Sequence, residues 1–190
     1  MKQLLITTIA AVLLVGCGKS KREQLEAICW NNSKIIALAL HMFANDHDGK
    51  LPWQVSEKDG GSMEYISPRS DKNALLDASG DPIFDENAWR HFLALAPTAG
   101  SFSIFNCPTS EKKWKDKPTS SDEVSYWLLT DENLNFNNAK YPSDAFFSVC
   151  PHHPDKSYIA SAAHGGAMNV PWQKISQYII KGRELKAEGN

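Results

Sequence analysis

The sequence predicts a single α+β domain in which one long helix precedes a set of short antiparallel strands. Apolar residues recur at three- and four-residue steps over residues 23–46, as expected for one face of an amphipathic helix. Short runs of β-branched and aromatic residues follow in the second half of the chain. Because these runs do not alternate with helical segments, we do not expect a parallel sheet.

Composition and charge are those of a globular domain. The chain has 190 residues, of which 42% are hydrophobic and 22% charged, with a formal net charge of −2. These values exclude a disordered or collagen-like chain, and the length permits a core that needs no disulfide. Since there is no basic block, we expect no nucleic-acid partner.

The N-terminus has the pattern of a secretory signal. Lys2 supplies a positive charge, and residues 4–15 form an uncharged, mainly apolar run, shorter than the ~20 residues that span a membrane. Residues 14–17 resemble the lipobox of bacterial lipoproteins. The resemblance implies that Cys17 is acylated, for example with palmitate, and becomes the first residue of a membrane-anchored protein. A plain signal peptide or a buried N-terminal helix is the alternative.

This interpretation divides the chain into four parts. Residues 1–16 are the signal peptide, 17–24 the lipidated cysteine and charged leader, 25–182 a single domain, and 183–190 a flexible tail. Gly18 follows the cysteine, which resembles the outer-membrane address of well-studied lipoproteins. We therefore expect a lipid-anchored protein of the cell envelope that is held in the outer membrane and faces the periplasm or the cell surface.

The secondary-structure elements are predicted from hydrophobic periodicity and from the residues that end helices or form turns. The first helix is expected over about 23–46, with Gly49 and Pro52 as its stop, and a second over 86–96, capped by Asp85 and ended by Pro97. The stripe of the first helix comprises Leu25, Ile28, Asn32, Ile35, Ile36, Ala39 and Phe43, in which Asn32 is the polar exception. The other expectations are an irregular region over 51–80, strands over 101–105, 124–130 and 145–150, a loop over 111–122 and a last helix over 171–181.

Residues 29–52 are similar to a helix of type II secretion pseudopilin G-like proteins of planctomycete- and verrucomicrobia-type bacteria. Further similar segments are Phe105-Asn106-Cys107-Pro108, Ser125-Tyr126, Tyr141-Pro142-Ser143 and the His-Gly-Gly element over 164–170. The resemblance implies a pilin-like fold, a long N-terminal helix packed on a small antiparallel sheet.

The sequence departs from that family at two places. A lipobox and a charged leader replace the prepilin leader and its continuous apolar helix, and Pro171 shortens the last strand. We therefore expect a pilin-like head that serves as a non-enzymatic lipoprotein. Its expected partners are the membrane and other pilin-like or secretion-system proteins.

Three cysteines remain besides Cys17. They are Cys29, Cys107 and Cys150. Because three is an odd number, at most one intramolecular disulfide forms among them. Outside the cytoplasm such a bond is permitted. We favour Cys107–Cys150, and Cys29 could pair with either. Three buried thiols, packed as small hydrophobic residues, are the alternative.

Two sets of residues are weak metal candidates, although no cofactor is expected. His152, His153 and His164 could serve zinc, but their spacing matches no recognised pattern, and a solvated loop with a glycine turn is simpler. Asp46 and Asp48 resemble the start of a calcium loop whose later ligands are missing, so a helix-ending turn is simpler.

Two further functions remain open beside the anchored pilin-like module. One is an envelope metal-binding protein or hydrolase that uses the three histidines. The other is a surface carbohydrate-binding or ligand-binding module, in which Trp53, Trp114 and Trp127 stack on sugars. No nucleophile elbow, phosphate loop or His-Glu-x-x-His motif is present.

Overall fold

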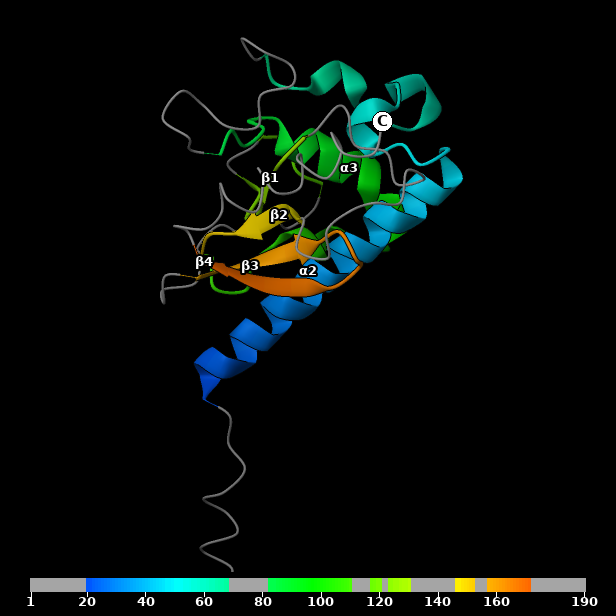
Figure 1. Ribbon diagram of the computed structural model, residues 1–190. Coiled ribbons are helices and arrows are strands. Elements are labelled where there is room, and N and C mark those ends of the chain that lie inside the picture. The colour runs from blue at the N-terminus through cyan, green and yellow to red at the C-terminus, as the bar shows by residue number, and fades with distance from the viewer. Residues whose placement is uncertain are drawn as a thin grey trace, which may run out of the picture.

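The α+β class is confirmed by the structure, a computed structural model. It describes residues 20–68, 82–110, 117–120, 123–130, 146–152 and 157–171. These residues form two α-helices, four 3₁₀ turns and a four-stranded antiparallel sheet (Figure 1). The signal segment, Cys17, Trp114, His153 and the helix expected over 171–181 lie outside the described residues, apart from Pro171. No helix of the described part is long and apolar enough to cross a membrane.

Helix α2 spans Lys21–Asp46 and matches the predicted first helix within two residues at its start. It begins with a capping box, in which the Ser20 hydroxyl accepts from the Glu23 amide and the Glu23 carboxylate accepts from the Ser20 amide. It ends in two left-handed residues, Asp48 (φ 54°) and Gly49 (φ 79°). The Gly49 amide donates to the carbonyl of Ala44, which satisfies one of the orphan acceptors at the helix end.

The buried face of α2 differs from the predicted stripe, because Leu25 and Ile35 are only half-buried and Ile28 is exposed. Ile28 is 49% exposed, and the adjacent Cys29 is fully buried in its place. The full set of buried residues on the helix is Cys29, Asn32, Ser33, Ile36, Ala37, Ala39, Leu40, Phe43 and Ala44. This face is wide because the sheet and the second helix both pack against it. Asn32, the polar exception, donates its Nδ2 to the carbonyl of Asn106 at 3.1 Å.

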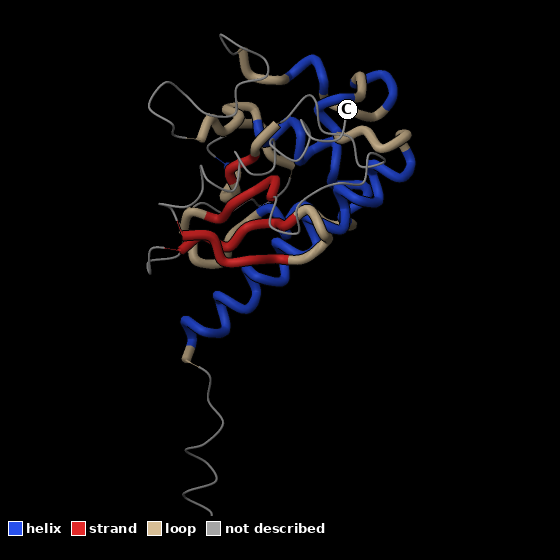
Figure 2. The backbone as a smooth tube through the Cα atoms, viewed as in Figure 1, coloured by secondary structure: helices blue, strands red, loops and turns tan. Residues whose placement is uncertain are grey.

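Four antiparallel strands form the sheet in the order β1-β2-β3-β4. They are β1 (Trp127–Leu128), β2 (Phe146–Cys150), β3 (Ser157–Ala162) and β4 (Ala167–Pro171). Helix α2 runs across one face of this sheet and contacts β2, β3 and β4 (Figure 2). The strand expected over 145–150 is confirmed as β2, whereas only two residues of the strand expected over 124–130 are paired. Pro171 is itself part of β4, paired with Ser157 of β3, and the residues after it, where the strand was expected to be cut short, lie outside the described part of the chain.

The turn between β3 and β4 carries the His-Gly-Gly element and rests on α2. Gly165 has φ 83°, and its amide donates to the carbonyl of Ala162 at 3.1 Å. The His41 side chain of α2 hydrogen-bonds the carbonyl of Ala163 in the same turn. The glycine therefore allows the tight turn that was expected here, and the helix holds it.

Helix α3 spans Ala88–Ala99, so its predicted limits were wrong at both ends. Asn87 is the N-cap residue, and Asp85 acts two residues earlier by accepting from the Asn87 amide at 2.8 Å. Pro97 lies within the last turn. The helix ends only at Gly100, which adopts the left-handed conformation (φ 80°) and donates to Ala96. A glycine that tolerates this conformation thus sets the end of the helix, and the proline does not.

The strand predicted over 101–105 was also wrong, because the segment is a 3₁₀ turn, η4 (Phe102–Phe105). The Ser101 hydroxyl accepts from the amide of Ser103, which favours a turn over an extended chain. Ile104 and Phe105 are both buried although they are consecutive, so the alternation that indicated a strand does not describe their burial. The region after α2 contains three further turns, η1 (Pro52–Gln54), η2 (Glu57–Asp59) and η3 (Met63–Tyr65).

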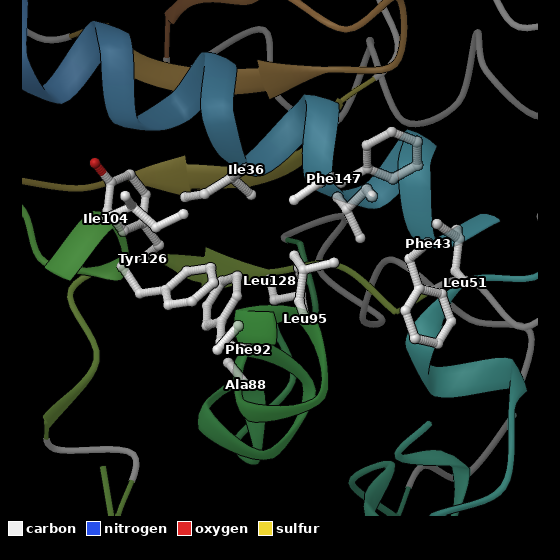
Figure 3. Packing of buried hydrophobic residues seen from close by; sticks show 14 of the residues in the cluster. Ile36, Phe43, Leu51, Ala88, Phe92, Leu95, Ile104, Tyr126, Leu128 and Phe147 are labelled. Carbon is white, nitrogen blue, oxygen red and sulfur yellow. The ribbon is translucent and has the colours of Figure 1, made fainter. Parts of the chain in front are cut away.

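The core lies between α2, α3 and the sheet. Figure 3 shows Ile36 of α2, Leu95 of α3 and Leu128 of β1 pointing into this space. Phe92 and Phe105 stack with their ring centres 4.7 Å apart. Trp53 is fully buried in the same cluster, so it cannot be one of the exposed sugar-stacking tryptophans considered above. Trp127 is 38% exposed.

Candidate functional site

The structure brings the three cysteines together inside the core. Cys29 lies on α2, Cys107 follows η4, and Cys150 is the last residue of β2. Their Sγ atoms all lie within 4.8 Å of one another, and all three side chains are fully buried. The three residues are free thiols in this structure. Three elements that are distant in sequence therefore meet at one cluster of sulfur atoms, called the cysteine triad below.

Two backbone constraints place the triad. Asn32 lies one helical turn after Cys29, and its hydrogen bond to the Asn106 carbonyl holds the residue before Cys107 against α2. Cys150 is fixed by its pairing with Ile159 of β3, which α2 also contacts. The helix, the segment after η4 and the end of β2 are thus fixed relative to one another.

Two hydroxyl groups contact the triad. The Tyr126 Oη lies 3.3 Å from the Cys29 Sγ, and the Thr109 Oγ1 lies 2.8 Å from the Cys107 Sγ. Thr109 also donates to the carbonyl of His152 at 3.2 Å, which links the segment after Cys107 to the segment after β2. Because the single hydroxyl proton of Thr109 goes to the His152 carbonyl, Thr109 accepts from the Cys107 thiol, whereas the Tyr126 hydroxyl can either donate to Cys29 or accept from it.

Burial and contacts within the triad raise the pKa of two of its thiols, Cys29 and Cys150. The neighbouring Cys107 thiol and burial raise the pKa of Cys29 to about 12, although Cys150 and Tyr126 act in the opposite direction. Contacts with Cys107 and Cys29, together with burial, raise the pKa of Cys150 well above its ordinary range. Burial likewise raises the pKa of the Tyr126 phenol. At neutral pH Cys29 and Cys150 are therefore protonated and poor nucleophiles.

The arrangement permits two kinds of chemistry. Three sulfur ligands are the donor set that soft metal ions such as Cu(I) and Zn²⁺ prefer. Structural zinc sites use four ligands, and within the described residues the triad supplies three. Two of the thiols could instead form a disulfide, which leaves the third as a thiol beside the bond.

The residues predicted from the sequence as metal ligands lie elsewhere. In the part of the chain that the structure describes, His152, His164, Asp46 and Asp48 join no group of three potential ligands. His164 is exposed, and a Cβ atom on Gly166 would lie 2.5 Å from its ring, so this ring covers the turn. Asp46 and Asp48 are exposed at the end of α2, where Asp48 forms part of the helix-ending turn.

A second buried cluster contains serine, histidine and aspartate. The Ser62 Oγ and the His91 Nδ1 share a hydrogen bond of 2.7 Å, and the His91 Nε2 lies 3.5 Å from the Asp85 Oδ2. Asp85 also accepts from the amide and hydroxyl of Ser67 and from the Thr130 hydroxyl at 2.8 Å. We call Ser62, Ser67, Asp85, His91 and Thr130 the polar cluster.

The polar cluster has the composition of a catalytic triad but the burial of a structural network. Ser62 and His91 are each 1% exposed and Asp85 is 4% exposed, so a substrate cannot reach the hydroxyl. Burial raises the pKa of Asp85, but His91 and the two hydroxyl groups outweigh it and hold the pKa below its usual range. The carboxylate therefore joins the segment after η3, the start of α3 and the end of β1.

Sequence reasoning did not identify Tyr126, Thr109 or His91 as members of these sites. Thr109 offered one signal, since it stands two residues after Cys107 and a short side chain there can turn back onto the sulfur. Tyr126 and His91 offered none, because their partners are distant in the sequence.

In comparisons with protein-family models, curated proteins and solved structures, none matched this chain.

Proposed function

We propose that this chain is a lipid-anchored, non-enzymatic protein of the bacterial cell envelope, with a pilin-like head that contacts other envelope or secretion-system proteins. One observation carries the proposal. Helix α2 begins at Lys21, four residues after Cys17, and continues without a break across the antiparallel sheet. A lipid on Cys17 would thus be joined almost directly to the element on which the domain is built.

The exposed end of α2 supports a surface lipoprotein over a filament subunit. Residues 21–24, Lys-Arg-Glu-Gln, are all exposed, and Figure 1 shows this end of the helix extending beyond the sheet. Arg22 and Glu26 form an ion pair of 3.0 Å along it. A charged and solvated helix end cannot stack in the apolar core of a filament, because the charges would lose their water.

The buried polar groups support a non-enzymatic role. The cysteine triad and the polar cluster hold the nucleophile types that an enzyme would use, and both are closed to substrate. Exposed apolar side chains instead line one side of α2, where Ile28, Leu38 and Met42 are each about half exposed. Exposed apolar groups of this kind are a feature of surfaces that bind other proteins.

The anchor is tested by mass spectrometry of the N-terminal peptide and by membrane fractionation in the native bacterium. We expect Cys17 to be the first residue and to carry acyl chains, and Cys17→Ser to lose both the processing and the anchor. Gly18→Asp is the matched control, because it should keep the acylation and alter only the distribution between membranes. An unmodified thiol at position 17 in wild-type cells would contradict the proposal.

The partner is tested by photo-crosslinking in cells. A photoreactive amino acid at Leu38 or Met42 should give adducts with another pilin-like or secretion-system protein. The same group at Lys58, which is exposed on η2, is the control and should give none. If both positions on α2 give no more adduct than Lys58, α2 is not the contact surface and this part of the proposal is wrong.

A further inference from the structure

We propose that Cys29, Cys107 and Cys150 form a three-way disulfide site, in which any two can bond and the third remains as a thiol beside them. The inference depends on the proposed function in one respect, since an envelope location supplies the oxidant. It goes beyond a fixed pair of cysteines, because the position of the bond is itself variable.

The convergence of the sulfur atoms carries the argument. All three Sγ atoms lie within 4.8 Å of one another, so no cysteine is set apart from the other two and each pair is close. Each cysteine belongs to a different element, and so each pairing joins a different two of α2, the segment after η4, and β2. Whichever two cysteines are bonded, the third thiol stays beside the bond, because all three side chains are fully buried in the core.

The surroundings favour a disulfide over a metal ion. The three cysteines belong to the main hydrophobic cluster, together with residues such as Ile36, Phe105 and Leu128. Three thiolates around a singly or doubly charged ion would leave a net negative charge there, which an apolar environment disfavours. A disulfide and a protonated thiol carry no charge and require no fourth ligand.

The chemistry needs an external disulfide as oxidant, either a small molecule or an oxidoreductase. The thiolate of one cysteine attacks a sulfur of that disulfide, which forms a mixed disulfide and releases one thiol of the oxidant. The thiolate of a second cysteine then attacks the first, which forms the internal bond and releases the second thiol. Two electrons and two protons pass from the protein to the oxidant, which is thereby reduced to two thiols.

The internal bond can then move without further oxidation. The third cysteine, as a thiolate, attacks one bonded sulfur, and the other bonded sulfur leaves as a thiolate and takes up the proton. Because all three cysteines are fully buried, the oxidation and the movement of the bond are both slow in the folded protein. The bond therefore forms as the chain folds, and afterwards it is shielded from external reductants.

The test is residue-level alkylation of the full-length protein, isolated from membranes in detergent and denatured in the presence of N-ethylmaleimide. Mass mapping then follows each of the three cysteines, so the state of Cys17 does not enter the result. We expect each chain to show one alkylated cysteine of the three before reduction and two more after it. We also expect disulfide-linked peptides from more than one pairing.

Single variants show whether every pair is competent. Cys29→Ala, Cys107→Ala and Cys150→Ala should each form the disulfide of the remaining pair, and any double variant should form none. Alanine is chosen because a serine hydroxyl would be unsatisfied in this apolar site. If a variant does not fold, the pairings mapped in the wild-type protein still decide the question.

Three results would overturn the inference. These are one fixed pairing in the wild type, a folded single variant whose remaining pair stays reduced, and a stoichiometric metal ion bound to the isolated protein. Refolding with glutathione disulfide separates this inference from the proposed location. If the bond forms in that experiment but is absent from the protein isolated from cells, the triad is competent and the envelope location is wrong. If it also fails to form on refolding, the triad itself is not a disulfide site.

Discussion

Replacing Asp85 by asparagine tests whether its carboxylate holds the polar cluster together. The side chain is 4% exposed and accepts four hydrogen bonds, two from Ser67, one from the Asn87 amide and one from Thr130. Asn has the same shape but one acceptor oxygen, so about two of these donors lose their partner. Hydrogen bonds to a charged group contribute about 1.5–3 kcal/mol each. We therefore expect Asp85→Asn to lower the free energy of unfolding by about 3–6 kcal/mol.

The same carboxylate predicts a dependence on pH. Because the pKa of Asp85 is lowered in the folded state, the unfolded chain binds this proton more readily. The contribution of Asp85 to stability is therefore complete above its ordinary pKa of about 3.9 and is lost as the pH falls below that value. Wild-type protein should therefore lose stability progressively as the pH falls below about 4, and Asp85→Asn should lose less.

Urea unfolding followed by tryptophan fluorescence at pH 7 and at pH 3 measures both effects. Trp53 is a suitable reporter, since it is buried with its ring centre 6.1 Å from that of His91. Glu86→Gln is the matched control, because Glu86 is exposed and directly adjacent in the chain. If Asp85→Asn costs no more than Glu86→Gln at pH 7, or if both respond equally to acid, the carboxylate does not stabilise the fold as described.

Three further predictions concern stability and are read by the same urea assay. Gly61→Ala should lower the free energy of unfolding by several kcal/mol, because its new Cβ would lie 2.0 Å from a backbone carbonyl oxygen. Its control, Gly60→Ala, would meet no atom and should cost only about 1 kcal/mol for the left-handed backbone. Equal costs for the two variants would contradict this. Ser20→Ala should cost about 1 kcal/mol by removing the capping box, and Ser20→Asp, which can still cap, should cost less. Phe92→Ala should cost about 3–5 kcal/mol, because a fully buried ring is lost; a cost under 1 kcal/mol would show that the site collapses.

The sequence predicted what local periodicity determines. Helix α2 was predicted because its stripe extends over many turns, and β2 because its apolar run is short and bounded by turn residues. Strand β3 was missed, since Ser157–Ala162 has little alternation and is defined by its pairing with β2 and β4. The segment over 102–105 was assigned to the wrong class, because four residues cannot distinguish a strand from a 3₁₀ turn.

The candidate site was predicted in its residue types but not in its geometry. The odd number of cysteines indicated one disulfide at most, yet the sequence could not show that all three meet. Their convergence depends on contacts between residues far apart in the chain, such as Asn32 with Asn106. Such contacts leave no periodic signal, so a network like the polar cluster is visible only once the elements are placed.

The direction of α2 determines how the domain bears a mechanical load. The helix has 26 residues, which at ~1.5 Å per residue makes it about 39 Å long, and its buried residues, from Cys29 to Ala44, pack against the sheet and α3. Tension applied to the chain at Ser20 acts along the helix axis, so it shears many side-chain contacts at once and does not peel them apart in turn. The domain is therefore built to resist a pull from its N-terminal end.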